Sequence, residues 1–121
     1  MNKKIVKIKK VESLLSQRIR DIYQDRLEHE LDNISYQLFD CTLIIMLEGT
    51  ITLPEKLLKN NDRHCLAEEV RKLIDSIIHP QIQSSIEDIL NVRVVDFLSD
   101  TTIEQNMTGA IAIFEFESKD I

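Results

Sequence analysis

The segment Glu48–Leu58, with the sequence EGTITLPEKLL, constrains the fold more than any other part of the chain. It holds one of only two glycines and one of only two prolines in 121 residues. Thr52 and Glu55 have the spacing of a capping box, in which both side chains bond free backbone N–H groups at the start of a helix. Pro54 fits the first helical turn, where a missing N–H costs nothing. The segment therefore predicts a strand that stops at Gly49 and a helix that starts near Thr52.

Two long segments have the periodicity of amphipathic helices. Between Val11 and Leu31 the apolar residues recur in steps of three and four, which places them on one helical face. The same periodicity runs from about residue 63 to Leu90, with Pro80 in its middle. We expect Pro80 to kink this helix, or to break it so that a second helix starts nearby. Asn91 is suited to ending the helix because it tolerates the left-handed conformation.

A hairpin is predicted between the first helix and the capping box. Residues 34–39 alternate between apolar and polar side chains, which indicates a half-buried strand. Asp40 and Cys41 are placed to form a tight turn. Residues 42–47 are continuously apolar and rich in β-branched side chains, as expected for a central strand buried on both faces.

Two more strands are predicted after the second long helix. Residues 92–98 and 110–117 are the candidates, and the polar residues 99–108 form a long connection between them. The order is therefore helix, hairpin, helical crossover and two strands. This order predicts an α+β two-layer domain with a mostly antiparallel four-stranded sheet. The crossover from the second to the third strand would be right-handed if those strands run parallel.

Charge is unevenly distributed along the chain. The formal net charge is −6, but the first ten residues carry +5, which leaves 10 basic and 21 acidic residues, or −11, for the remainder. The lysines of the first ten residues are Lys3, Lys4, Lys7, Lys9 and Lys10. An acidic body argues against binding duplex nucleic acid, which depends on neutralising phosphates. We expect residues 1–10 to form a flexible basic tail that can contact an acidic partner or an anionic membrane surface, and residues 11–121 to form a single domain.

The sequence carries no sign of membrane insertion or export. No run approaches the roughly 18 apolar residues that a spanning helix needs. The N-terminal lysines are not followed by the apolar stretch of a signal peptide. We therefore expect a cytoplasmic protein in which Cys41 and Cys65 are reduced thiols.

Patterns for cofactors, metals and nucleophiles are missing from the sequence. There is no glycine-rich phosphate loop, so no nucleotide cofactor is predicted. His29, His64 and His79 do not stand at zinc-ligand spacing from one another or from the cysteines, so no metal is predicted. His64 and Cys65 are adjacent, and neighbouring helical side chains diverge by about 100°, which argues against a catalytic dyad.

An acidic cluster at strand ends is the remaining candidate for chemistry. Glu48, Asp96, Ser99 and Asp100 lie at or near the ends of predicted strands and would come together if those strands were neighbours. The other interpretation is that the carboxylates form structural salt bridges with Arg71 or Arg93, and that Ser99 stabilises a turn.

Self-association is predicted from the amount of apolar surface. The two amphipathic helices can cover only one face of a four-stranded sheet. The strands LIIML and AIAIF are apolar enough that the other face also needs a cover. A second copy of the chain is the usual cover, so we expect a homodimer.

Several segments resemble the MpsC family, a group of small bacterial proteins long catalogued as a domain of unknown function. The resemblance covers about 100 residues, and segments such as RHCLAEEVRKLIDSIIHPQI resemble its cyanobacterial branch. The residues that carry the family pattern are Gly49, Thr52, Pro54, Glu55, Lys56, Arg71, Pro80, Ser99 and Asp100. One departure is residues 28–33, EHELDN, where the family usually has a glycine-rich element.

The resemblance implies a function without catalysis. The family name comes from a sodium-translocating, membrane-potential-generating system whose larger subunits handle ion and inorganic-carbon uptake. A soluble accessory or regulatory subunit, acting by homodimerisation and contact with a protein partner, is the first hypothesis. The second is a small-ligand-binding or hydrolytic domain that uses Glu48, Asp96, Ser99 and Asp100. The family offers no catalytic residues to transfer to this chain, so the enzyme hypothesis is the weaker one.

Overall fold

Three helices and four strands make up the part of the chain that the structure describes. A computed structural model describes residues 3–116, and the side chains of residues 8–116. The order α-β-β-α-α-β-β confirms the predicted α+β class. The elements are α1 (Lys3–Leu27), β1 (Asn33–Phe39), β2 (Thr42–Glu48), α2 (Leu53–Asn60), α3 (His64–Leu90), β3 (Val92–Thr102) and β4 (Met107–Phe116).

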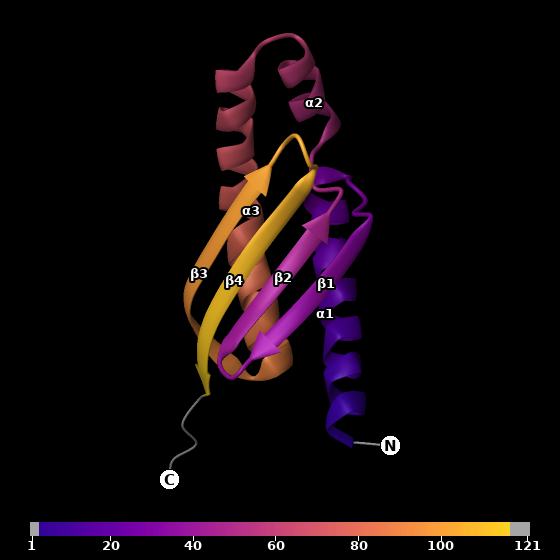
Figure 1. The fold of residues 1–121 in the computed structure, drawn as a ribbon, viewed down its shortest axis with the longest axis vertical. Helices are drawn as coiled ribbons and strands as arrows, with labels where there is room; N and C mark the ends of the chain where they lie inside the picture. The colour runs from indigo at the N-terminus through magenta and orange to yellow at the C-terminus, as the bar shows by residue number, and fades with distance from the viewer. Residues whose placement is uncertain (1–2, 117–121) are drawn as a thin grey trace.

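The strands form one fully antiparallel sheet in the order β1-β2-β4-β3. The hairpin β1–β2 turns at Asp40, which has a φ of 47°. The helical crossover through α2 and α3 carries the chain to the far edge of the sheet, where β3 lies, and β4 returns between β3 and β2. In Figure 1 the sheet faces the viewer and α1 and α3 lie behind it.

The core lies between the sheet and the two long helices. Strand side chains alternate, so only one face of each strand contributes to it. Leu43, Ile45 and Leu47 of β2 are at most 5% exposed. The helices contribute mainly Leu15, Ile19, Ile22, Tyr23, Ile74, Ile78, Ile82 and Ile86.

The first helix is displaced relative to its predicted bounds. It begins at Lys3, inside the segment predicted as a tail, and ends at Leu27 rather than Leu31. Glu28 takes a φ of 50°, which a continuing helix does not allow. The chain then turns toward the sheet, where Asp32 N–H donates to Glu48 O over 2.8 Å. Leu31 is buried in this connection, which explains why the periodicity extended past the helix.

Pro80 does not divide the second long helix. Residues His64–Leu90 form one helix with Pro80 inside it, so of the two predicted alternatives, a kink or a break, the break with a second helix is wrong. Pro80 is exposed, while Ile78 and Ile82 on either side are at most 2% exposed. Packing of these flanking isoleucines into the core compensates for the hydrogen bond that proline removes. Asn91 ends the helix with a left-handed φ of 57°, as predicted.

The last hairpin is longer than predicted. β3 continues to Thr102 and β4 begins at Met107, so most of the expected polar connection is strand. Threonine favours strands, and the inward hydroxyls of Thr101 and Thr108 bond each other across the pair at 2.7 Å. The connection shortens to residues 103–106, and Asn106 supports it by accepting a bond from Ile51 N–H over 2.8 Å.

Candidate functional site: an open sheet face and a buried ion pair

A buried ion pair joins α2 to α3. Glu55 is 0% exposed and Arg71 is 7% exposed. The guanidinium of Arg71 binds both carboxylate oxygens, with Nε 2.8 Å from Oε2 and Nη2 2.7 Å from Oε1. Thr52 adds its backbone N–H and its hydroxyl to Oε1, at 3.0 and 2.9 Å. Glu55 therefore caps the helix as predicted and also accepts a two-point bond from an arginine sixteen residues away.

The ion pair extends into a larger polar cluster at this end of the sheet. Arg71 also donates to Thr50 O at 3.1 Å and to Asp75 Oδ1 at 3.3 Å. Thr108 of β4 donates its hydroxyl to Thr50 Oγ1 at 2.9 Å. We call Thr50, Thr52, Glu55, Arg71 and Asp75 the ion-pair cluster. Because it ties α2 and α3 to the chain that leaves β2, its role in the fold is to fix the helical crossover on the sheet.

Two titratable side chains next to the ion-pair cluster have shifted pKa values. Burial raises the pKa of Tyr23 to about 12, against the opposing positive charge of Arg71. Burial lowers the pKa of His79, and its neighbour Asp75, 3.6 Å away, only partly offsets this. His79 also packs on the ring of Phe97, with centroids 5.2 Å apart. At neutral pH Tyr23 is therefore protonated and His79 is neutral, so neither changes charge there.

The four residues of the predicted acidic cluster are not brought together. Asp96 and Asp100 lie on the same side of β3, but Ser99 points to the opposite side. Glu48 is on β2, and β4 separates it from β3. Asp96 and Asp100 accept bonds from the next N–H along their own strand, both at 2.9 Å, and Glu48 accepts one from Asn33. Ser99 Oγ is buried without a hydrogen-bond partner among the described residues.

The arginines offered as partners for that cluster bind elsewhere. Arg71 binds Glu55 and Asp75, as described above. Arg93 forms a salt bridge with Glu115 on the neighbouring strand, and this pair is exposed. The structural salt bridges expected from the sequence therefore exist, but with other carboxylates.

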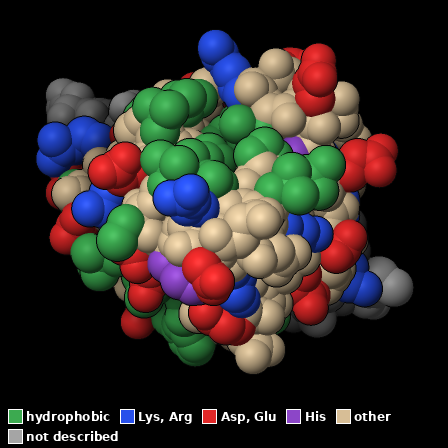
Figure 2. Space-filling model, turned by 90° about the horizontal axis from the view of Figure 1, so that it is seen from above, with side chains coloured by type: hydrophobic (Ala, Val, Ile, Leu, Met, Phe, Trp, Pro, Cys, Tyr) green, Lys and Arg blue, Asp and Glu red, His purple; other side chains and the backbone are tan. Residues whose placement is uncertain are grey.

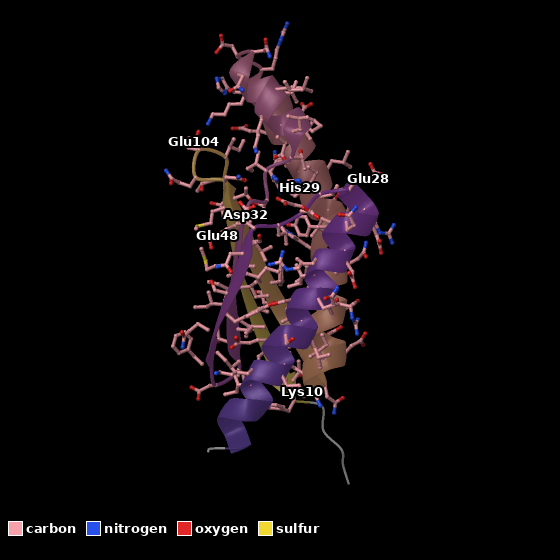
Figure 3. All side chains as sticks on the ribbon, turned by 90° about the vertical axis from the view of Figure 1, so that its right-hand side faces the viewer. Lys10, Glu28, His29, Asp32, Glu48 and Glu104 are labelled. Carbon is pink, nitrogen blue, oxygen red and sulfur yellow. The ribbon has the colours of Figure 1, made fainter. Side chains whose placement is uncertain are left out.

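The corner between α1 and β1, where the sequence departs from the family pattern, lies against the end of β2, where Asp32 is next to Glu48 (Figure 3). Gly49 has a φ of 81°, and a Cβ there would lie 2.6 Å from Asp32 Oδ2, so glycine is required. His29 Nε2 donates to Gly49 O over 2.6 Å. Histidine thus has a structural role at this corner. The described residues contain no group of three or more His, Cys, Asp or Glu side chains placed to hold a metal ion.

The face of the sheet that the helices leave open has an apolar centre. The sequence predicted a β2 buried on both faces, but only Leu43, Ile45 and Leu47 are buried, and the alternate residues are half-buried. Phe39 and Leu98 are both 52% exposed on this side. We call the following residues the open-face patch: Phe39, Ile44, Met46, Leu98, Ile111 and Ile113. The view in Figure 1 looks onto this face.

A shallow hollow of about 350 Å³ lies within the open-face patch. Its floor is at Gly109, and Ile44, Met46, Leu98 and Ile111 form its walls. A Cβ at position 109 would lie 3.4 Å from Met46 Sδ, so any larger side chain there would fill part of the hollow. Charged side chains border the patch on one side, with Asp96 and Asp100 on β3.

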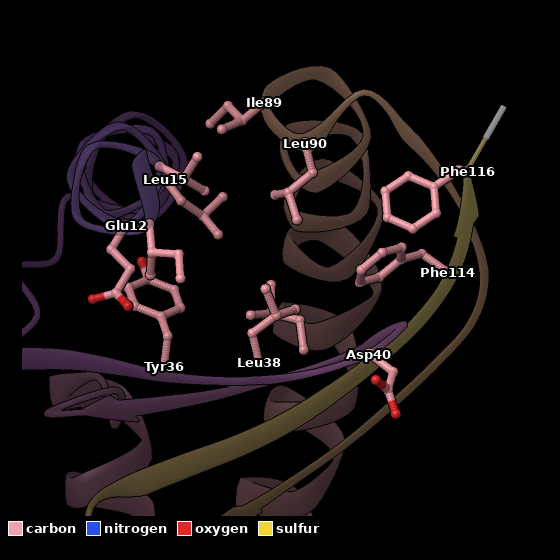
Figure 4. Close-up of a pocket in the computed structure, with 12 residues that line it drawn as sticks. Glu12, Leu15, Tyr36, Leu38, Asp40, Ile89, Leu90, Phe114 and Phe116 are labelled. Atoms are coloured by element: carbon pink, nitrogen blue, oxygen red, sulfur yellow. The ribbon is translucent and has the colours of Figure 1, made fainter. Parts of the chain in front are cut away.

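Two further apolar surfaces lie at opposite ends of the molecule. Seen from the α2–α3 end, hydrophobic side chains gather in neighbouring groups (Figure 2), and Leu53, Leu57, Leu66 and Leu73 of these helices are 46–67% exposed. At the other end, a cavity of about 260 Å³ opens between α1, α3 and the sheet. Leu15, Leu38, Leu90 and Phe114 point toward its interior (Figure 4).

Comparison with known protein families identifies the family of this chain. A family model described as Na⁺-translocating membrane potential-generating system (MpsC) matches residues 7–116. The chain belongs to the MpsC family. No curated protein and no solved structure matches it. None of the helices in the described part of this MpsC protein is long and apolar enough to cross a membrane.

The structure gives several residues of the MpsC pattern a local role. Gly49 makes the turn after β2, Glu55 and Arg71 form the buried pair, and Thr52 caps α2. Lys56 and Pro80 are exposed on their helices. The pairing of Glu55 with Arg71 was missed from the sequence, because nothing in the local spacing relates residues of separate helices.

Proposed function

We propose that this MpsC protein is a non-enzymatic accessory or regulatory subunit of a sodium-translocating, membrane-potential-generating system. It acts in the cytoplasm through protein–protein contact, and its basic N-terminal segment contacts an acidic partner or an anionic membrane surface. Family membership supports the link to the system. The engagement of Glu55 and Arg71 in holding the fold supports a non-catalytic role, because an activated group needs an unsatisfied proton donor or acceptor facing substrate.

The observation that carries the proposal is the apolar open face of the sheet. A sheet face exposed to water normally carries polar side chains, whereas this one carries the open-face patch, including Ile111 at 37% and Leu98 at 52% exposure. We infer that a second copy of the chain covers it, so that the protein is a homodimer.

The size of the open face supports a reversible dimer. Four strands about 4.8 Å apart and seven paired residues of about 3.3 Å each give a face of roughly 450 Å². Two such faces remove about 900 Å² from water, which is below the roughly 1,200–2,000 Å² of stable specific interfaces and in the range of weak, transient ones. We therefore expect a weak dimer that dissociates on dilution.

A complementation experiment tests the proposed function. The gene that encodes this chain is deleted in the source organism, and the membrane potential of the cells is followed with a voltage-sensitive dye in sodium and in potassium medium. We expect the deletion to lower the potential in sodium medium only. The wild-type chain should restore it, and Leu98→Asp, which puts a charge into the open-face patch, should not. An unchanged sodium-dependent potential in the deletion strain would rule out the proposed role.

A further inference from the structure

We propose a specific arrangement of the two copies, in which β1 of each copy lies opposite β3 of the other and the two-fold axis runs parallel to the strands. The inference rests on the proposed homodimer and specifies how its interface is built. Two arguments carry it: the distribution of charge across the open face, and the shape of the hollow at Gly109.

The open face is acidic along one edge and uncharged along the other. On β3, Asp96 and Asp100 flank Leu98 on this face, and Arg93 nearer the start of the strand is paired with Glu115 of β4. On β1, the residues on this face are Asn33, Ser35, Gln37 and Phe39, none of which is charged. Because the edges differ, the two possible arrangements of an aligned sheet pair differ in their electrostatics.

Face-to-face sheets pack with their strands nearly aligned, so the two-fold axis runs either along the strands or across them. An axis across the strands places each strand over its own copy. The two β3 strands would then meet, with four carboxylates along one line in a partly dehydrated interface. Like charges brought together in this way disfavour association.

An axis along the strands avoids this repulsion. It reverses the strand order β1-β2-β4-β3, so each β3 meets the uncharged β1 and each β2 meets β4. A two-fold axis along the strands also leaves positions along the strand direction unchanged, so each row of paired residues lies opposite the same row of the second copy. Ser35, Met46, Gly109 and Asp100 form one such row. The hydroxyl of Ser35 therefore lies opposite Asp100 of the second copy, where it can donate to the carboxylate.

The same row explains the hollow at Gly109. With β2 opposite β4 of the second copy, Met46 of one copy points at Gly109 of the other. The hollow is lined by Ile44, Leu98 and Ile111 and, from the same copy, by Met46, whose Sδ lies beside Gly109. In the proposed dimer this unbranched, adaptable side chain turns away from its own Gly109 and enters the hollow of the other copy. Each copy offers one hollow and one Met46, so the contact is made twice around the axis. A surface that presents a projection and a matching recess in one row is complementary to itself.

Cross-linking between engineered cysteines tests the arrangement. All variants carry Cys41→Ser and Cys65→Ser, which remove the two native thiols. The first variant adds Ser35→Cys and Asp100→Cys, which face each other across the interface in the proposed arrangement. The second adds Asp96→Cys and Asp100→Cys, which lie too far apart along β3 to be linked within one copy and come opposite each other when β3 lies over β3 with Leu98 at the axis. Both are treated with a short bismaleimide at a concentration where sedimentation velocity finds dimer.

We expect the first variant to form at least ten times more cross-linked dimer than the second. Dimer cross-linked mainly through the second variant would overturn the arrangement while leaving the homodimer in place. A third outcome, sedimentation as a monomer at every concentration of the wild-type chain, would overturn the dimer itself and the arrangement with it. Equal cross-linking of both variants also overturns the proposal, because the two pairs cannot both face each other in one closed dimer.

Discussion

The ion-pair cluster and the open-face patch differ in opposite ways from the usual distribution of side chains: the cluster buries polar groups, and the patch exposes apolar ones. In the cluster, the polar side chain of Glu55 is 0% exposed, and four hydrogen bonds reach its carboxyl group. In the patch, Leu98 is apolar yet 52% exposed, and no residue of the described chain covers it. Polar groups are buried where the chain needs a fixed geometry, and apolar groups are exposed where the proposed second copy would bind.

This contrast indicates that the ion-pair cluster affects the stability of the fold, whereas the open-face patch affects association between copies. A buried, fully bonded charge contributes little net stability, but removing one partner leaves the other charge buried and alone. An exposed apolar side chain contributes little to the fold of a single copy, so its replacement should change binding instead. Substitutions in the ion-pair cluster should therefore change the stability of the fold, and substitutions in the open-face patch should change association.

Loss of Arg71 should be the most damaging change. Arg71→Ala leaves the carboxylate of Glu55 buried without its cation, which costs about 3–5 kcal/mol of unfolding free energy. This is a large part of the roughly 5–15 kcal/mol that holds a domain together. Urea unfolding followed by circular dichroism measures the loss.

Two controls sharpen this prediction. The exposed pair Arg18–Asp88 is 3.4 Å long with both side chains about half exposed or more, so Arg18→Ala should cost at most about 1 kcal/mol. The double variant Glu55→Leu/Arg71→Met, which removes both charges, should be more stable than Arg71→Ala alone. A loss of less than about 1 kcal/mol in Arg71→Ala would contradict the structural role of the cluster.

Alkaline pH should lower the free energy of unfolding through the ionisation of Tyr23, which lies next to the ion-pair cluster. In the unfolded chain Tyr23 ionises near its ordinary pKa of 10.0, whereas the folded protein keeps the proton until about pH 12. The unfolded state therefore gains stability as pH rises from 10 to 12, and the fold loses about 2–3 kcal/mol over that window. Tyr23→Phe should remove this part of the pH dependence in urea titrations. If the wild-type chain and Tyr23→Phe show the same dependence of stability on pH, the pKa of Tyr23 is not raised in the folded protein.

Ser99→Ala should have a small effect of the opposite sign. Ser99 Oγ is buried without a partner in the described structure, so removing it should stabilise the fold by about 1 kcal/mol. Thr101→Ala is the matched control, because the Thr101 hydroxyl bonds Thr108 at 2.7 Å and its loss should destabilise the fold by about 1 kcal/mol. Destabilisation by Ser99→Ala would indicate that its hydroxyl has a partner, as a ligand-binding role requires.

Local sequence chemistry was sufficient to predict most of the fold. Thr52 and Glu55 mark the start of α2, Gly49 marks the end of β2, and Asn91 takes the left-handed conformation that ends α3. Each of these signals acts within a few residues, which is why the sequence alone reveals it. The break considered at Pro80 and the long connection predicted after Leu98 were wrong for the same reason, because local signals do not include the tertiary neighbours of these residues.

The contacts that define the two contrasting regions could not be predicted in the same way. Glu55 meets Arg71 only because α2 folds back on α3, and the acidic residues Glu48 and Asp100 lie apart only because β4 enters between β2 and β3. Strand order is decided by packing over the whole domain. The apolar character of the open face was nevertheless visible beforehand, since the composition of β2 and β4 exceeded what one helical layer can cover.

Sedimentation velocity of three proteins tests the central claim most directly. The wild-type chain, Leu98→Asp in the open-face patch and Leu73→Asp on α3 are compared over a range of concentrations from about 1 to 200 μM. Leu73 is 61% exposed, so its substitution is a matched change at an apolar surface away from the sheet. We predict that the wild-type chain and Leu73→Asp form a dimer, whereas Leu98→Asp sediments as a folded monomer with unchanged thermal stability. A wild-type monomer at all concentrations, or a dimer that Leu73→Asp disrupts and Leu98→Asp does not, would contradict the account.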